Sequence, residues 1–331
     1  MKKFLLLLSM ILLLTGCGGK EISGEVASVT PQGYYMAISL AGREQVILAD
    51  RDTHIFSFSD EIPSEQLLIG QLCAPRITAS GLRWTAEGYV ADSICVDSTI
   101  LPEPYILSDG TSLNIRKHHL HTAYETPDGT ILLWETDPIG PENVHGGSAP
   151  SLDSLSSQAQ TAITAYYEEQ GLLYDLDAQL ETAYQAYLKS EDKLLFQCHH
   201  LSQEVIPSAA SEKIISFSTI LTLPVDGNHV QELRYNTVFE RSTGEIIEPA
   251  DLFQCPQEEI ASGFLTAAKI QDPDLLRKMV NAFRPEYLIL GPSALELWFP
   301  KNTLEGTEES HIVCADYGDL TELLYPWAIP D

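Results

Sequence analysis

The spacing of apolar residues constrains this chain most, because it changes twice along the sequence. Apolar and polar residues alternate in short runs from 21 to about 135, which is typical of half-buried strands. Apolar residues then recur at helical spacing over 151–188, and alternation returns from Lys193 onward. Strands and helices are therefore segregated along the chain, which predicts an α+β fold class.

Residues 21–100 predict a small all-β domain. Their short apolar runs are broken by turn residues at the spacing of a small barrel. The pattern resembles the small OB-like barrels found near the amino terminus of many bacterial lipoproteins. The runs that carry this resemblance are 24–29, 34–40, 45–48 and 83–90.

Residues 101–150 predict hairpins, which either extend the barrel or begin the second domain, followed by a linker. Tight turns are expected at 108–110 and 127–129, where Asp-Gly pairs lie between apolar runs. The stretch 138–150 is rich in Pro and Gly, which break regular structure, so it is the expected linker.

The rest of the chain, 151–331, predicts one α+β domain with packed helices on an antiparallel sheet. Its helices are expected at 151–170, 176–188, 256–270 and 274–283. Its strands are expected at 194–200, 213–223, 229–241, 286–290, 294–299 and 311–314.

The amino terminus predicts export and lipid anchoring. Lys2 and Lys3 precede an apolar run, 4–14, that is shorter than the roughly 20 residues needed to span a bilayer. Small residues then lead to Cys17, which resembles the lipobox of bacterial lipoproteins. We expect a signal peptide at 1–16, cleavage after Gly16, two-chain lipidation of Cys17, and a tether at 17–20. An ordinary secreted protein is the alternative.

The composition adds a strong acidic bias. The 19 Lys and Arg side chains face 47 Asp and Glu, for a formal net charge of −28, and loss of the signal peptide with Lys2 and Lys3 leaves 17 basic side chains. We therefore expect no binding of nucleic acid or of an anionic membrane surface. The charge favours a basic protein partner, although solubility alone explains it as well.

Besides Cys17 the chain has five cysteines, so at least one thiol stays free or pairs between chains. Cys73 and Cys95 fall in the same expected domain and are candidates for a bridge, but spacing does not establish the geometry. The pairing stays open for Cys73, Cys95, Cys198, Cys255 and Cys314.

The second half also carries a family resemblance. Residues 234–240, the Thr-Gly turn at 242–245 and the Asp-Leu-Phe segment at 249–253 form its first part, with Asp251 as the expected helix cap. A closing hairpin and last strand at 287–290, 295–300 and 317–320 form its second part. Together they resemble the extracytoplasmic domain of lysozyme-sensing anti-sigma factors, which is also attached to a peptidoglycan deacetylase.

This resemblance implies a role in the cell envelope and, from the anti-sigma members, binding of lysozyme. Two departures limit what it implies. We find no membrane helix with a sigma-binding segment, so transmission of a signal is not expected. We also find no deacetylase domain, so that enzyme's chemistry is not expected either.

The densest cluster of potential metal ligands is Lys117-His118-His119-Leu120-His121. In one extended strand, His119 and His121 share a face and His118 points to the other, so further ligands would be needed. His199 and His200 point to opposite faces. We expect no metal site and no cofactor.

Catalytic motifs are also weak. Ser190 and Lys193 fit a Ser-x-x-Lys spacing, but the companion motifs are missing. Adjacent glutamates are expected to be solvated faces rather than acid and base pairs. These pairs are Glu168 with Glu169, Glu258 with Glu259, and Glu308 with Glu309.

The sequence therefore predicts a lipid-anchored, non-catalytic binding or sensing protein at the outer face of the cell membrane. Its expected partners are a basic protein such as lysozyme or a cell-wall glycan. The alternatives are a peptidoglycan-modifying hydrolase and a structural accessory of an envelope complex.

Overall fold

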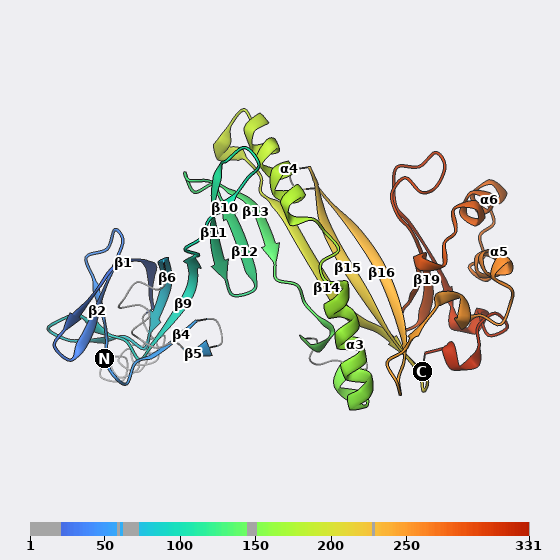
Figure 1. Cartoon of the computed structure of the whole chain (residues 1–331), viewed down its shortest axis with the longest axis horizontal. Helices are drawn as coiled ribbons and strands as arrows, with labels where there is room; N and C mark the ends of the chain where they lie inside the picture. The colour runs from blue at the N-terminus through green and yellow to red at the C-terminus, as the bar shows by residue number, and fades with distance from the viewer. Residues whose placement is uncertain (1–20, 58–59, 62–72, 144–150, 227–228, 331) are drawn as a thin grey trace, which may run out of the picture. The chain divides into compact units, whose positions relative to one another are not determined.

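The computed structural model describes residues 21–57, 60–61, 73–143, 151–226 and 229–330 (Figure 1). The expected signal peptide, Gly16 and Cys17 lie outside these residues. Within them, no helix is both long and apolar enough to cross a bilayer. The described chain combines extensive β-sheet with helices, a mixed architecture compatible with the predicted α+β class.

The chain divides into two compact units, each formed from two stretches of sequence. The first contains Met1–Glu135 and Ala183–Phe196, and the second contains Thr136–Thr182 and Gln197–Asp331. The hairpins of residues 101–135 thus fall in the same unit as the strands of 21–100, the first of the two alternatives left open by the sequence.

Strand β1 (Ile22–Gln32) organises the first unit because it pairs with two different strands. Its first four residues pair antiparallel with β6 (Cys73–Ser80), and the rest pair with β2 (Tyr35–Leu40). The register shifts between Val26 and Ser28, which is a β-bulge. Because a bulge bends a strand, β1 passes from one sheet into the other.

Strand β9 (Ser93–Ile100) extends this arrangement. It is antiparallel to β6 and parallel to β4 (His54–Ser57), and its end pairs with β11 (Ser112–His118). These pairings do not by themselves establish the OB-like barrel. The other short strands here are β3 (Val46–Ala49), β5 (Asp60–Glu61), β7 (Arg83–Trp84) and β8 (Tyr89–Val90).

The hairpins of residues 101–135 confirm both predicted turns. Gly110 N donates to Leu107 O and Gly129 N donates to Thr126 O, each at 2.9 Å. Both glycines have φ of 87°, a conformation that glycine adopts without strain. The strands that these turns connect or flank are β10 (Tyr105–Ile106), β11, β12 (His121–Glu125) and β13 (Ile131–Thr136).

Helix α4 (Leu176–Lys189) confirms the helix predicted at 176–188. From Ala183 onward it belongs to the first unit, where two tyrosines hold it. Tyr184 Oη lies 3.1 Å from Thr111 Oγ1, and Tyr187 Oη donates to Asp128 Oδ2 at 3.2 Å.

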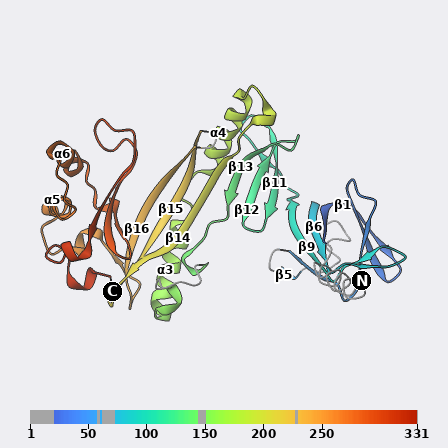
Figure 2. The ribbon, with the colours of Figure 1, turned by 180° about the vertical axis from the view of Figure 1, so that it is seen from behind.

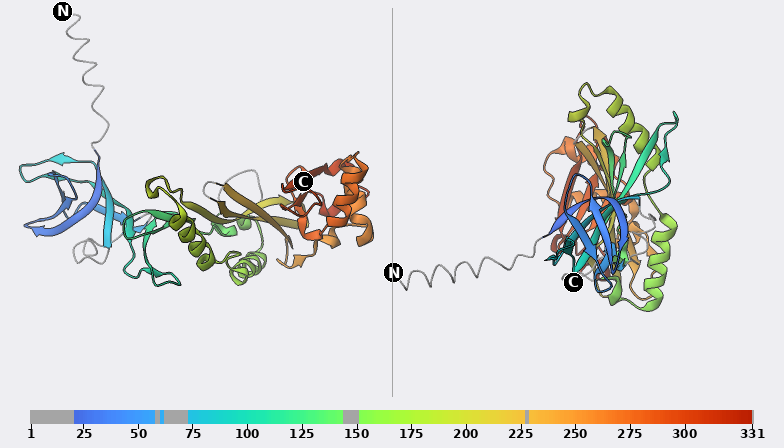
Figure 3. Two further views of the ribbon diagram at one scale, coloured as in Figure 1. Left: turned by 90° about the horizontal axis from the view of Figure 1, so that it is seen from above. Right: turned by 90° about the vertical axis from the view of Figure 1, so that its left-hand side faces the viewer.

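The second unit is based on three long antiparallel strands, which confirms the predicted meander except for its first strand, expected at 194–200 but found at 199–210 after a 3-10 turn at Lys193–Leu195. They are β14 (His199–Ala210), β15 (Ile214–Asp226) and β16 (His229–Glu240), with short β17 (Ile246–Ile247) paired to the end of β16. Helix α3 (Ser157–Gln170) packs on one face of this sheet, seen from behind in Figure 2 and from above in Figure 3. The apolar residues between helix and sheet include Ala159, Ile163, Tyr167, Val205, Ile215, Phe217 and Phe239.

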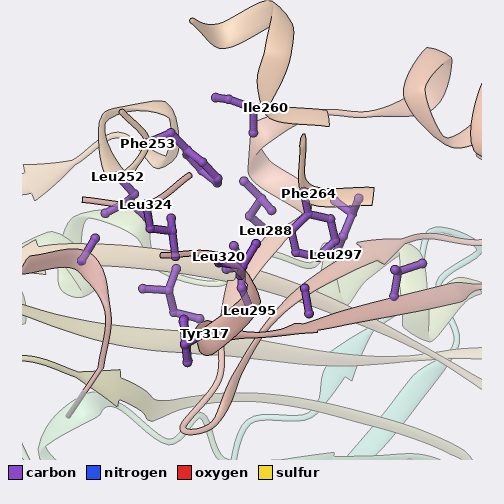
Figure 4. Packing of buried hydrophobic residues seen from close by; sticks show 14 of the residues in the cluster. Leu252, Phe253, Ile260, Phe264, Leu288, Leu295, Leu297, Tyr317, Leu320 and Leu324 are labelled. Carbon is purple, nitrogen blue, oxygen red and sulfur yellow. The ribbon is translucent and has the colours of Figure 1, made fainter. Parts of the chain in front are cut away.

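The carboxyl-terminal part packs around an apolar core, drawn in Figure 4, to which Ala209, Ile214 and Val238 of the long strands also contribute. Leu295 and Leu297 from the small sheet pack there with Ile260 and Phe264 from a helix, and Leu320 closes the core. The elements are α5 (Gln257–Ala267), α6 (Pro273–Ala282), β18 (Leu288–Leu290), β19 (Ala294–Phe299) and β20 (His311–Asp316).

Two details of the family resemblance are corrected. Asp251 does not cap a helix with its side chain, because it lies inside a short 3-10 helix, Pro249–Leu252, that begins after Glu248. Residues Tyr317–Asp319 form another 3-10 turn, so the last strand is β20 rather than 317–320. The remaining 3-10 turns are Pro141–Asn143, Leu152–Ser154, Lys193–Leu195, Pro285–Tyr287 and Pro326–Ala328.

Candidate functional site

A cavity of about 760 Å³ lies in the second unit, where four segments meet. The segments are the start of α3, the turn between β14 and β15, the end of β16, and the 3-10 turn near the carboxyl terminus. We call it the Trp327 cavity. It is lined by Ser154, Leu155, Ser156, Ser211, Glu212, Lys213, Glu240, Arg241, Ser242, Pro326, Trp327 and Ile329.

Two cations line this cavity although the chain is strongly acidic. Lys213 Nζ lies 4.4 Å from the centroid of the Trp327 ring, a cation–π contact. Arg241 Nη1 donates to Ser211 O at 2.8 Å. Neither side chain takes part in the carboxylate ion pairs of the described residues, so both cations keep donors for a ligand.

Trp327 is fixed from several sides. Its carbonyl accepts a hydrogen bond from Ser211 Oγ at 2.6 Å, and the Tyr325 ring stacks on its indole at 5.5 Å with 11° between the planes. Tyr325 N in turn donates to Leu252 O at 2.9 Å. An aromatic ring held this way offers a preformed surface to a ligand, with little ordering cost.

The opposite wall is fixed by the helix cap and by a glycine. Ser156 Oγ accepts from Ala159 N at 3.2 Å as the N-cap of α3 and donates to Ser242 O at 2.9 Å. Gly244 has φ of 76°, and a Cβ there would stand 2.8 Å from Ala159 O. The glycine of the Thr-Gly turn at 242–245 therefore allows the chain after β16 to pack closely against α3.

The cavity combines two cationic donors, serine hydroxyls and an aromatic wall. Its size falls within the range of about 300–1,000 Å³ common for small-molecule sites. Guanidinium and ammonium groups recognise carboxylates, and an indole packs against apolar faces such as those of sugar rings. This chemistry suits binding of an anionic ligand that carries a ring or a short chain.

Sequence reasoning missed this site. The residues before Lys213 (Ser-Glu) and before Arg241 (Phe-Glu) form no recognisable motif. The two cations come together only because β15 pairs with β16. At the end of this pairing, Arg241 N donates to Lys213 O at 2.9 Å. A usable signal was that Ser211-Glu212-Lys213 is a turn with a cation in an otherwise acidic chain.

The histidine cluster is arranged differently from the prediction. The strand ends at His118, the chain turns at His119 and Leu120, and the next strand begins at His121. The rings of His118 and His121 therefore both contact Trp134, at centroid distances of 4.8 and 5.6 Å. The expectation that His119 and His121 share a face was wrong because it assumed one continuous strand.

No group of three or more potential metal ligands occurs among the described residues. Burial and the positive charge of Arg116 lower the pKa of His118. The second pair behaves as predicted, because His199 is buried whereas His200 is exposed. His200 Nε2 lies 3.7 Å from Cys198 Sγ, a contact that the sequence reading did not consider.

Ser190 and Lys193 are engaged elsewhere than with each other. Ser190 Oγ donates to Asp192 O at 3.0 Å, whereas Lys193 Nζ contacts the carbonyl and the ring of Tyr187. Ser190 and Lys193 therefore do not form a pair of nucleophile and base in this structure. The adjacent glutamates at 168–169, 258–259 and 308–309 are all exposed, as expected of solvated faces.

Among the side chains that the structure describes, Cys95, Cys198, Cys255 and Cys314 are free thiols. The backbone register places Cys73 opposite Ile100 and Cys95 opposite Thr78, several residues apart along the paired strands. Cys95 is thus not part of the candidate bridge, in keeping with a register that sets it well away from residue 73 along the strands. Burial raises the pKa of the Cys95 thiol.

No protein-family model matches the sequence, and no curated protein matches it. Solved structures of two DUF3298 family proteins are similar at a low level. One, from Pseudomonas aeruginosa PAO1, has 15% identity and a TM-score of 0.29, covering 53% of this chain and 82% of that chain. The other, from Bacteroides fragilis NCTC 9343, has 10% identity and a TM-score of 0.36, covering 69% and 92%.

Proposed function

We propose that this chain is a lipid-anchored binding protein of the bacterial envelope, and that the Trp327 cavity binds a carboxylate-bearing cell-wall component. The address rests on the lipobox-like sequence that ends at Gly16 and Cys17. The ligand class rests on one observation: Lys213 and Arg241 line the cavity beside a fixed indole. Cell-wall glycopeptides carry carboxylates next to sugar rings, which fits this arrangement.

Charge alone does not favour an anionic ligand, since the whole chain has a net charge of −28. Charges farther apart than about 8 Å are largely screened at physiological salt, however. The two cations act within hydrogen-bond distance, where screening is weaker. We therefore expect association to be slow at low salt and binding to persist at moderate salt.

The test is co-sedimentation of the chain beginning after Gly19 with purified insoluble peptidoglycan. Arg241→Gln and Lys213→Gln should each reduce the bound fraction at equal protein concentration. Lys189→Gln is the matched control, because Lys189 is exposed and lies outside the cavity. Equal sedimentation of all four proteins would contradict the assigned site, and no sedimentation of any would contradict the ligand class.

A second candidate function is binding of lysozyme or another basic protein. The net charge of −28 and the resemblance of residues 151–331 to lysozyme-sensing domains support it. Titration with lysozyme at low and moderate salt, with lysozyme activity followed in the same samples, tests this candidate. Saturable one-to-one binding that weakens with salt is expected, and absence of binding at both salts would remove lysozyme.

The hydrolase and accessory alternatives are separable in the same samples. A hydrolase releases soluble fragments or acetate from peptidoglycan over time, whereas a binding protein leaves the composition of peptidoglycan unchanged.

For the fold of the first unit we propose the OB-like barrel. The participation of β1 in two sheets supports it.

A further inference from the structure

A second cavity, of about 410 Å³, lies on the sheet face opposite α3 and shares no residue with the Trp327 cavity. One wall is the β14–β16 sheet and the other is the turn between β18 and β19. We call it the Arg234 cavity. Its lining is mainly Ile, Pro and Ala, with four polar or charged side chains: Ser208, Ser218, Arg234 and Glu296.

Arg234 is held with its terminal nitrogens left for a ligand. Its guanidinium lies 4.8 Å from the centroid of the Trp298 ring, and Nε donates to Glu232 Oε1 at 2.6 Å. Because Nε is engaged by Glu232, Nη1 and Nη2 are the remaining donors, and this pair suits a carboxylate. The contact with the buried Trp298 ring and the bond to Glu232 limit the movement of the guanidinium.

Glu296 supplies the opposite charge from the other wall. It lies in β19, paired with Ile289 of β18 and Cys314 of β20. Gly291 lies beside this carboxylate, since a Cβ at that position would be 3.7 Å from Glu296 Oε1. The carboxylate thus borders the cavity where a cationic group can reach it.

A hydroxyl and amide network holds the two walls in place. Asn236 Nδ2 donates to Ser216 Oγ at 2.7 Å, and Ser208 Oγ donates to the same Ser216 oxygen at 3.0 Å. Leu290 N donates to Asn236 Oδ1 at 3.0 Å, which ties β18 to β16. Because these hydrogen bonds already order both walls of the cavity, a ligand that binds there loses less free energy to ordering side chains.

We propose that the Arg234 cavity binds a zwitterionic ligand, a short peptide with both termini free, with its carboxylate on Arg234 and its ammonium on Glu296. The apolar lining strengthens both charge pairs because it excludes water. The Ile and Pro side chains that line the cavity would contact the apolar groups of such a peptide. This site does not depend on the function proposed for the Trp327 cavity.

The test is calorimetric titration with alanyl-alanine, in its L,L and D,D forms, and with two blocked versions of it. The N-acetyl version lacks the ammonium group and the amide version lacks the carboxylate. Glu296→Gln should weaken the free dipeptide about tenfold or more but leave the N-acetyl version unchanged. Arg234→Gln should weaken the free dipeptide similarly but leave the amide version unchanged.

Arg234→Lys keeps a charge at the position and should give an intermediate affinity, even if Arg234→Gln unfolds. Lys213→Gln, in the Trp327 cavity, is the control and should change none of these affinities. The proposal is overturned if no dipeptide binds saturably, or if each substitution weakens all three probes equally. Failure of the Trp327 cavity as a cell-wall site would leave these results unaffected.

Discussion

The ammonium group of Lys213 lies over the indole of Trp327 at 4.4 Å, joining the β14–β15 turn to the carboxyl-terminal turn of the same unit. The Ser211 Oγ bond to Trp327 O ties the same two segments through the backbone. These contacts make one wall of the Trp327 cavity from residues that are distant in sequence. Trp327 therefore has a structural role as well as the proposed ligand contact.

Trp327→Ala should lower the free energy of unfolding by on the order of 2 kcal/mol, because it removes a half-buried indole and its cation–π partner. Chemical denaturation followed by circular dichroism measures this loss. Trp327→Phe keeps a ring under Lys213 and should recover about half of it. Equal losses for the two variants would show that the ring does not hold this wall.

Gly244→Ala should be more costly than an alanine at another glycine with positive φ. Gly244 has φ of 76° and its Cβ site is 2.8 Å from both Ala159 O and Ala162 Cβ, whereas Gly171 has φ of 61° and open space. Gly171→Ala should cost about 1 kcal/mol from backbone strain alone. Gly244→Ala should cost about 2 kcal/mol more, because α3 must shift. Thermal unfolding of both variants measures the difference.

The pH dependence of stability should report on His118. Burial, Arg116 and His121 lower its pKa below the usual 6.5. The unfolded chain then binds this proton more readily than the folded chain, so stability is lost as the pH falls below 6.5. His118→Phe keeps a ring against Trp134 and should lose stability less steeply between pH 7.5 and pH 5. Parallel melting curves for both proteins would contradict this assignment.

Thiol reactivity should be low in the folded chain. Burial raises the pKa values of Cys95, Cys198, Cys255 and Cys314, so little thiolate is present at neutral pH. Alkylation by iodoacetamide should be several times slower in the native protein than in the urea-unfolded protein. Mass spectrometry of the modified peptides reads each site, and rapid native labelling of Cys198 would show instead that His200 activates it.

Periodicity predicted most regular elements of the second unit because long elements average over many residues, although it placed β14 (His199–Ala210) at 194–200. The helix expected at 256–270 is α5 (Gln257–Ala267), and the strand expected at 294–299 is β19 with the same bounds. Turns without glycine, proline or asparagine were harder. The His119-Leu120 turn carries none of these residues, so the histidines were assigned to one strand.

The candidate site was not predictable from spacing, because it is created by register and by a distant tail. Lys213 and Arg241 become neighbours only through the β15–β16 pairing, and Trp327 lies beside them because it packs against the carboxyl-terminal core. A single Lys or Arg at a turn belongs to no sequence motif that would indicate a binding site. The cluster with the clearest pattern, at 117–121, instead packs around Trp134.

The most direct test of the central claim is titration with a disaccharide that contains N-acetylmuramic acid, beside the same disaccharide with its carboxylate converted to an amide. If Lys213 and Arg241 bind the carboxylate, the wild-type chain should bind the acid about tenfold more tightly than the amide. The double variant Lys213→Gln with Arg241→Gln should bind both equally. A preference for the acid that survives in the double variant, or equal binding by the wild type, would contradict the account.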